Sequence, residues 1–228
     1  MKRSWLLIIA LLIGVGSIAN DNRANALLVY LSKPCSKTDY LVGKWFGIFV
    51  PMAAIVAVPT LFFYGYCAMS YRDYGFIHQD PWLIVKLIGM IPIAAGFHAS
   101  VALGISSMFN QGRLAGAVYA GIYFMTGFVT FALSIARSVT LQQGGSVPHV
   151  LDTLFYFSVD GVQIAIAKIV LGTSGHVFLL NTRNFRRPPP QPPDAPNALL
   201  FFGIYIGICV VSMLIARSRI RAVEVIGS

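Results

Sequence analysis

The sequence predicts an all-α integral membrane protein, and its composition and the spacing of its apolar runs carry this prediction. Of the 228 residues, 57% are hydrophobic and only 11% are charged, and the mean hydropathy is +0.72. Soluble domains carry about 25% charged residues, so these values disfavour a soluble globular domain.

Five apolar runs approach or exceed the ~20 residues that a transmembrane helix needs. They cover residues 4–19, 45–68, 82–108, 114–136 and 197–216. We therefore expect a single transmembrane domain over residues 1–228, with five membrane-spanning helices.

The first run, residues 4–19, fits two interpretations. Lys2 and Arg3 precede the apolar residues, and Ser17-Ile18-Ala19 stands before a polar stretch, as in a cleavable signal peptide. The alternative is a short first membrane helix. We prefer the uncleaved helix, because a cleaved signal would leave Asn20 outside and reverse the orientation that the other cations indicate.

The polar segment 20–44 separates the first two runs. Its middle, residues 26–31, is too apolar for a plain loop and too short to cross a bilayer. A short apolar helix flanked by cations suits the membrane surface. Pro34 should end this helix, because proline lacks an N–H and disfavours a helical residue before it.

A second helix should begin soon after this proline. Ser36 or Thr38 can cap it, and Asp39 would lie in its first turn, where the helix dipole favours an anion. That helix would run directly into the apolar run at Trp45. The sequence therefore predicts an elbow at a membrane face.

The distribution of cations predicts the orientation. The side of segment 20–44 would hold eight Lys and Arg residues, and the short segments of the opposite side would hold three. The eight are Arg23, Lys33, Lys37, Lys44, Arg113, Arg217, Arg219 and Arg221; the three are Lys2, Arg3 and Arg72. The positive-inside rule makes the first side cytoplasmic, and with it the C-terminus. The net charge of +9 therefore marks cytoplasmic helix ends and does not indicate a nucleic-acid partner.

The connection 137–196 is long for a loop without structure of its own, and we expect it to be extracytoplasmic. Residues 151–171 are largely apolar but include Asp152, Asp160 and Lys168. We expect surface or re-entrant helices there, with a sixth membrane span as the alternative. A proline-rich spacer follows at residues 187–196.

Motifs for catalysis are scarce. The 228 residues contain no G-x-x-x-x-G-K-[ST] phosphate loop, so we expect no ATPase site, and no cofactor or metal, in this chain. The four histidines show no metal-ligand spacing. His98 lies inside a span, which makes it a candidate intramembrane polar site. The alternative is a neutral imidazole bonded to a neighbouring helix.

Three sequence motifs in the polar segment resemble those of ABC-2 type transporter permeases. They are Asp21-x-Arg23, then Tyr30-Leu31-Ser32-Lys33-Pro34-x-Ser36, then Asp39-Tyr40-Leu41-x-Gly43-Lys44. Members of that family commonly show an acidic–Arg pair, then Leu-x-Ser-Arg-Pro-x-Ser, then Tyr-Leu-x-Gly-Lys. Lys33 stands where arginine is usual, and Asn25 where glycine is common.

The resemblance implies a permease subunit that moves a substrate, with export as the expected direction, and a separate ATPase subunit that binds ATP. It also implies a second permease subunit, identical or different, and a bacterial inner membrane. In the family this segment contacts the ATPase; the matching positions here are Tyr30, Ser32, Lys33, Pro34, Ser36, Lys37, Asp39 and Tyr40.

Two questions stay open at this point. Family members usually have six spans, with a helix before the one that matches residues 4–19, so we expect that this sequence starts late or that the subunit is shortened. The alternative function is a multi-helix membrane enzyme or assembly factor in which His98 and residues 137–196 carry the function. The sequence does not identify a substrate.

Overall fold

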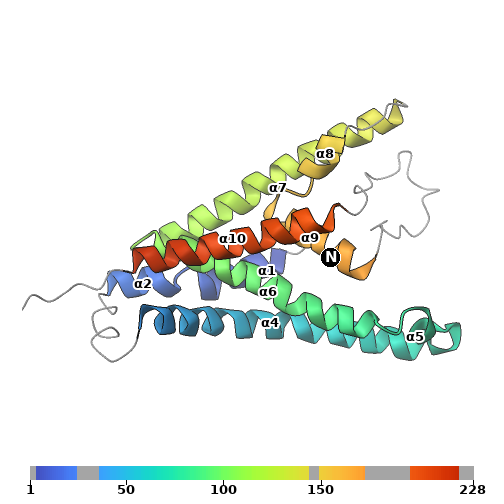
Figure 1. The fold of residues 1–228 in the computed structure, drawn as a ribbon, viewed down its shortest axis with the longest axis horizontal. Helices are drawn as coiled ribbons and strands as arrows, with labels where there is room; N and C mark the ends of the chain where they lie inside the picture. Colours follow the sequence, from blue (N-terminus) through green and yellow to red (C-terminus); the bar gives the residue numbers. More distant parts are fainter. Residues whose placement is uncertain (1–3, 25–35, 144–148, 173–195, 221–228) are drawn as a thin grey trace, which may run out of the picture. The chain divides into compact units, whose positions relative to one another are not determined.

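The computed structural model describes residues 4–24, 36–143, 149–172 and 196–220, and in that part of the chain every regular element is a helix (Figure 1). The elements are α1 (Ser4–Ile9), the π-helical turn η1 (Ala10–Gly14), α2 (Ser17–Arg23), α4 (Lys37–Ser70), the 3₁₀ turn η2 (Arg72–Tyr74), α5 (Phe76–Gln79), α6 (Leu83–Ser107), α7 (Gly112–Gln142), α8 (His149–Leu154), α9 (Val159–Leu171) and α10 (Ala198–Arg219).

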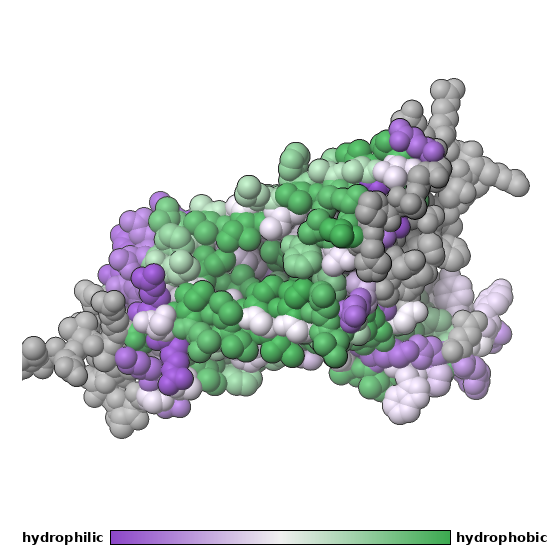
Figure 2. Space-filling view, turned by 45° about the horizontal axis from the view of Figure 1, so that its top comes forward, coloured by the Kyte–Doolittle hydropathy of each residue, from purple (hydrophilic) through white to green (hydrophobic). Residues whose placement is uncertain are grey.

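Five helical segments of the described chain are long and apolar enough to cross a membrane, which confirms the predicted fold class. They are Leu6–Arg23, Lys37–Ser70, Leu83–Ser107, Gly112–Leu141 and Ala198–Arg219. Large apolar side chains on them are exposed, for example Phe62 at 78% and Phe128 at 71%. Figure 2 shows hydrophobic side chains along the visible helix faces and hydrophilic ones towards helix ends. Such surfaces suit lipid contact.

The first span is not one regular helix. Val15 N–H donates to the Ala10 carbonyl, a π-type bond, and α2 then starts at Ser17 and continues to Arg23. The span therefore extends four residues past the expected end at 19. The break leaves early N–H groups of α2 without partners in their own helix. Two of them, from Ile18 and Ala19, donate to Ser106 Oγ of α6, each at 3.0 Å.

The second helix, α4, is much longer than a bilayer requires. Its 34 residues continue through two internal prolines and span about 50 Å at 1.5 Å per residue. The hydrocarbon core is only ~30 Å thick. The polar turns before Trp45 therefore extend the helix beyond its apolar part.

The chain divides into two compact units, residues 1–121 with 205–228 (unit 1) and residues 122–204 (unit 2). In unit 1, α4 and α1–α2 pack against α6, whose C-terminal half is buried from Ala95 to Ser107 except for the partly exposed Val101. Small residues allow close approach: a Cβ added at Gly104 would lie 2.9 Å from Ser212 Cβ of α10. This is the packing that small residues favour in membrane bundles.

Unit 2 contains α8, α9 and the adjoining parts of α7 and α10. Helices α8 and α9 have 6 and 13 residues, and a turn at 155–158 separates them. Neither reaches the ~20 residues of a membrane span. Within the described residues, the region 151–171 therefore forms two short helices, as we expected, and not a sixth span. The proline-rich stretch 187–196 lies outside the described residues except for its last position.

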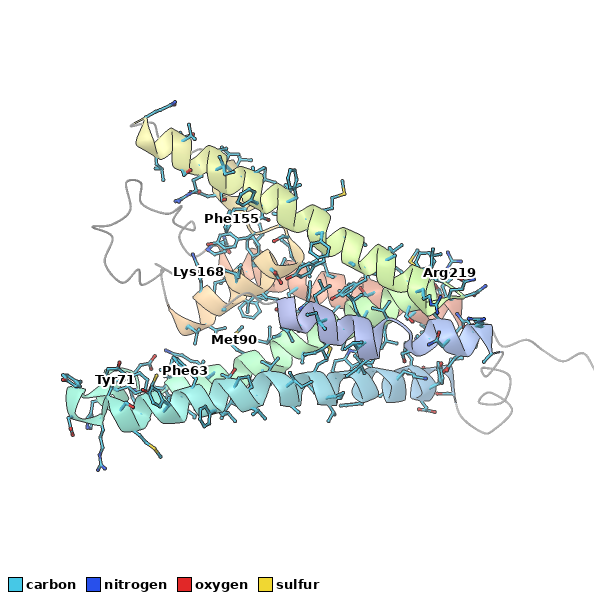
Figure 3. The ribbon with its side chains drawn as sticks, turned by 180° about the vertical axis from the view of Figure 1, so that it is seen from behind. Phe63, Tyr71, Met90, Phe155, Lys168 and Arg219 are labelled. Carbon is cyan, nitrogen blue, oxygen red and sulfur yellow. The ribbon has the colours of Figure 1, made fainter. Side chains whose placement is uncertain are left out.

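Polar side chains of α9 contact neighbouring elements within unit 2. Lys168 Nζ donates to Tyr156 Oη at 2.9 Å, and Tyr123 donates to Asp160. Lys168 is labelled in Figure 3. Asp160 and Lys168 thus each bond to a tyrosine. Tyr156 also packs with Ala165 and Phe201 in a small apolar core.

Candidate functional site

The start of α4 is a capped helix N-terminus. Ser36 Oγ accepts from Asp39 N–H at 3.1 Å, and Asp39 Oδ2 accepts from Ser36 N–H at 3.0 Å and from Ser36 Oγ at 2.7 Å. This reciprocal arrangement is a capping box, which satisfies two otherwise unpaired N–H groups. The capping prediction is confirmed, with Ser36 rather than Thr38 as the cap.

The capped turn presents polar side chains to its surroundings. Ser36, Lys37, Thr38 and Asp39 are exposed, and Tyr40 is half-buried. Four of the eight expected ATPase-contact residues are therefore described by the structure. The other four, Tyr30, Ser32, Lys33 and Pro34, lie outside the described residues, as do the short helix 26–31 and the proline break.

The Tyr40 side chain contacts α2. Its hydroxyl donates to Asp21 Oδ2 at 2.6 Å, and Lys44 Nζ contacts the same oxygen at 2.7 Å. We call Asp21, Tyr40 and Lys44 the Asp21 clasp. The side chains of Lys44 and Asp21 are only 28% and 18% exposed, so water screens the contact less than at an open surface.

Lys44 makes two further contacts in the clasp. Its Nζ donates to the Ser17 carbonyl at 3.3 Å and lies 5.7 Å from the centre of the Tyr40 ring, within cation–π range. The clasp thus joins α2 and α4. Sequence reasoning gave Tyr40 to the ATPase interface and missed this contact, although the four-residue spacing of Tyr40 and Lys44 places both on one helix face.

Basic residues gather at the same end of unit 1 as the clasp. A Cβ added at Gly112, the first residue of α7, would lie 2.9 Å from Asn20 Oδ1 of α2, so these two helix ends meet. Arg219 at the end of α10 and Tyr71 after α4 lie at opposite ends of unit 1 in Figure 3. The basic helix ends carry Arg23, Lys37, Lys44, Arg113, Arg217 and Arg219. Their grouping agrees with the cation pattern on which the predicted orientation rests.

A comparison with protein-family models decides the family. The model described as "ABC-2 family transporter protein" matches residues 5–217. This chain belongs to the ABC-2 transporter family. The match includes every helix from α2 to α9 and nearly all of α10. The comparison with curated proteins gives no match.

Family membership makes the chain an integral membrane protein and a transporter permease. The recognised resemblance is thereby confirmed, and the coarse function with it. The polar end of unit 1 is the part of this permease that combines a capped, exposed helix start with fixed contacts to a second helix.

His98, the candidate intramembrane polar site, bonds to a neighbouring helix in this permease. Its Nδ1 lies 2.5 Å from Tyr119 Oη, and both side chains are fully buried between α6 and α7. This contact supports the interpretation of His98 as a packing residue. No group of three potential metal ligands occurs in the described parts of the chain.

Other polar groups in unit 1 also hold helices together. Trp45 Nε1 donates to Ser100 Oγ at 2.9 Å, joining α4 to α6. Tyr205 Oη donates to the Ile93 carbonyl at 3.0 Å, joining α10 to α6. In an apolar environment each such bond satisfies a group that lipid cannot. These contacts stabilise the bundle and leave the start of α4 as the candidate site.

Proposed function

We propose that this permease is the membrane-spanning subunit of an ABC exporter and that a separate ATPase subunit supplies ATP hydrolysis. The family match over residues 5–217 is the observation that carries the proposal. The lack of a phosphate loop in the 228 residues supports a separate ATPase. Export is the direction that the resemblance implies.

The ATPase would dock on the start of α4 and on the segment before it. Ser36, Lys37 and Asp39 offer exposed polar and charged groups there, on a helix that extends well past its apolar part. The proposed contact also includes Tyr30, Ser32, Lys33, Pro34 and Tyr40. Because Tyr40 already bonds to Asp21, its part in the contact would be to hold the docking surface in place.

The orientation and assembly follow from the same proposal. The start of α4 and the C-terminus would face the cytoplasm of a bacterium, with the permease in the inner membrane, because the basic helix ends gather on that side. Two permease subunits, identical or different, would form the complete membrane part. No cofactor would bind this chain, since ATP would bind to the partner.

Copurification tests the docking surface. The tagged permease is co-expressed with a candidate ABC ATPase subunit, and recovery of the ATPase and its hydrolysis rate are measured. A hot-spot residue contributes at least ~2 kcal/mol, so we expect Lys37→Glu to weaken the affinity about thirtyfold and to reduce the recovery accordingly. Arg72→Glu, an exposed charge reversal beyond the other end of α4, is the matched control and should have no effect.

The opposite results would reject this proposal. Equal recovery with Lys37→Glu and Arg72→Glu would remove the start of α4 from the interface. Sustained ATP hydrolysis by the purified permease alone, free of contaminating ATPase, would contradict the separate ATPase subunit.

A further inference from the structure

The Asp21 clasp joins α4 to α2, the last helix of the first span. Ser17 and Asp21 are four residues apart on α2, and Tyr40 and Lys44 are four apart on α4, so each pair shares one helix face. Lys44 Nζ contacts both members of the α2 pair, Asp21 Oδ2 at 2.7 Å and the Ser17 carbonyl at 3.3 Å. Tyr40 adds the 2.6 Å bond to Asp21.

Asp21 is poorly placed for its own helix. It lies in the last turn of the seven-residue α2, where the dipole disfavours an anion. Its stabilisation therefore comes from α4, through two contacts on a single carboxylate oxygen. Charge-assisted hydrogen bonds of this kind are about twice as strong as neutral ones.

Helix α2 is also held on its other sides. Ile18 and Ala19 N–H groups donate to the buried Ser106 Oγ of α6. Asn20 lies against Gly112 at the start of α7. The first turns of α4 are therefore connected through α2 to α6 by hydrogen bonds and to the start of α7 by close packing.

We propose that Asp21, Tyr40 and Lys44 are positioning residues that pass the motion of the ATPase from the start of α4 to α2. This inference rests on the proposed function, in which the ATPase docks on the start of α4. The ATPase-facing side chains receive the motion, and the clasp transmits it to the first span.

Two reporter cysteines distinguish docking of the ATPase on α4 from transmission of its motion to α2. Neither reporter requires a known substrate. Thr38→Cys reports on the start of α4, and Ala24→Cys reports on the end of α2; both positions are exposed. Each is made in a background without Cys35, Cys67 and Cys209. The permease–ATPase complex in nanodiscs is labelled with an impermeant maleimide, without nucleotide and after trapping with ATP and vanadate.

With the native clasp, both reporters should change labelling rate on trapping. With Asp21→Asn, Thr38→Cys should keep its response and Ala24→Cys should lose it. The charge swap Asp21→Lys with Lys44→Asp should restore part of the Ala24→Cys response, which a purely structural loss would not do. Lys86→Met breaks another 2.7 Å ion pair of unit 1 and should leave both responses unchanged.

Each contrary result has a distinct meaning. A response of Ala24→Cys that survives both Asp21→Asn and Lys44→Met in an intact complex would overturn the clasp as a transmitter. The absence of an Ala24→Cys response with the native clasp, while Thr38→Cys responds, would overturn it as well. If the labelling rate of Thr38→Cys is the same with and without trapped nucleotide, the docking site of the proposed function is rejected. This inference is then rejected as well.

Discussion

The two ends of α4 hold ion pairs of equal length in different surroundings. Near its start, Lys44 Nζ lies 2.7 Å from Asp21 Oδ2. Beyond its end, in the hairpin that leads to α6, Lys86 Nζ lies 2.7 Å from Asp80 Oδ2. The first pair joins two helices. The second joins Asp80, just before α6, to Lys86 in the first turn of α6.

Burial and additional partners distinguish the two pairs more than distance does. The side chains of Asp21 and Lys44 are 18% and 28% exposed, and Tyr40 donates to the same carboxylate. Asp80 and Lys86 are both 34% exposed. Exposed pairs contribute about 0–1 kcal/mol because water and salt screen them. The Asp21 carboxylate thus bonds to side chains of a second helix, while the Asp80 carboxylate bonds to Lys86 and the Trp82 N–H, which lie within six residues of it.

Removal of the Ser106 hydroxyl, which accepts hydrogen bonds from α2, should give the largest loss in the free energy of unfolding. Ser106→Ala leaves two buried N–H donors of α2, from Ile18 and Ala19, without their partner, at about 1–3 kcal/mol for each unsatisfied group. We expect a loss of at least about 2 kcal/mol in thermal unfolding in detergent, followed by tryptophan fluorescence. The matched control is Ser107→Ala, since Ser107 donates only to the Gly104 carbonyl of its own helix. Equal losses for the two variants would contradict the account.

Removal of the Asp21 carboxylate should give the second-largest loss in the free energy of unfolding. Asp21→Asn removes the charge that Lys44 and Tyr40 share, and hydrogen bonds to charged groups contribute about 1.5–3 kcal/mol. We expect a loss in that range by the same unfolding measurement, and a similar loss for Lys44→Met. If the two losses add in the double variant, the residues do not interact and the comparison between the ends of α4 fails.

The hydroxyl of Tyr40 should matter less than the carboxylate. Tyr40→Phe keeps the ring beside Lys44 and removes one hydrogen bond to the carboxylate, so we expect a loss of about 1.5 kcal/mol, the lower end of that range. This variant sharpens the comparison because the third partner of the Asp80–Lys86 pair is a backbone group, the Trp82 N–H that donates to Asp80 Oδ1 at 3.2 Å. A loss as large as that of Asp21→Asn would mean that the hydroxyl, and not the ion pair, dominates the clasp.

We expect the smallest change in the free energy of unfolding for a substitution near the C-terminal end of α4. Lys86→Met removes the partly exposed ion pair with Asp80 and should change the free energy of unfolding by no more than about 0.5 kcal/mol. A loss comparable with that of Lys44→Met would show that the two ends are equivalent.

Local signals explain the parts of the fold that the sequence predicts. The apolar runs mark the five long helices, because length and hydropathy are properties of each segment alone. Ser36 and Asp39 stand three residues apart before an apolar run, which is enough to predict the capping box. The short helices α8 and α9 agree with the charges at Asp152, Asp160 and Lys168, which make a full span unfavourable.

Contacts between distant segments explain what the sequence did not show. Asn20 to Arg23 looks like the start of a loop, yet it is helical because Ser106, 88 residues from Ile18, supplies the partner for the N–H groups of α2. The π-helical turn in the first span could not be predicted from its residues, because Ala10–Gly14 contains no proline to mark a break in the helix. The hydrogen bond between Tyr40 and Asp21 was also not predicted, because the two residues lie 19 positions apart on different helices.

The most direct test of the central claim compares the two ends of α4 in the presence of the ATPase. Single cysteines at Thr38 and at Tyr74, which is 78% exposed, are labelled with an impermeant maleimide in inside-out vesicles, with and without the ATPase subunit. The account predicts that Thr38→Cys is labelled and that the ATPase protects it, while Tyr74→Cys is not labelled. Labelling of Tyr74→Cys with no labelling of Thr38→Cys, or labelling of Thr38→Cys that the ATPase leaves unchanged, would contradict it.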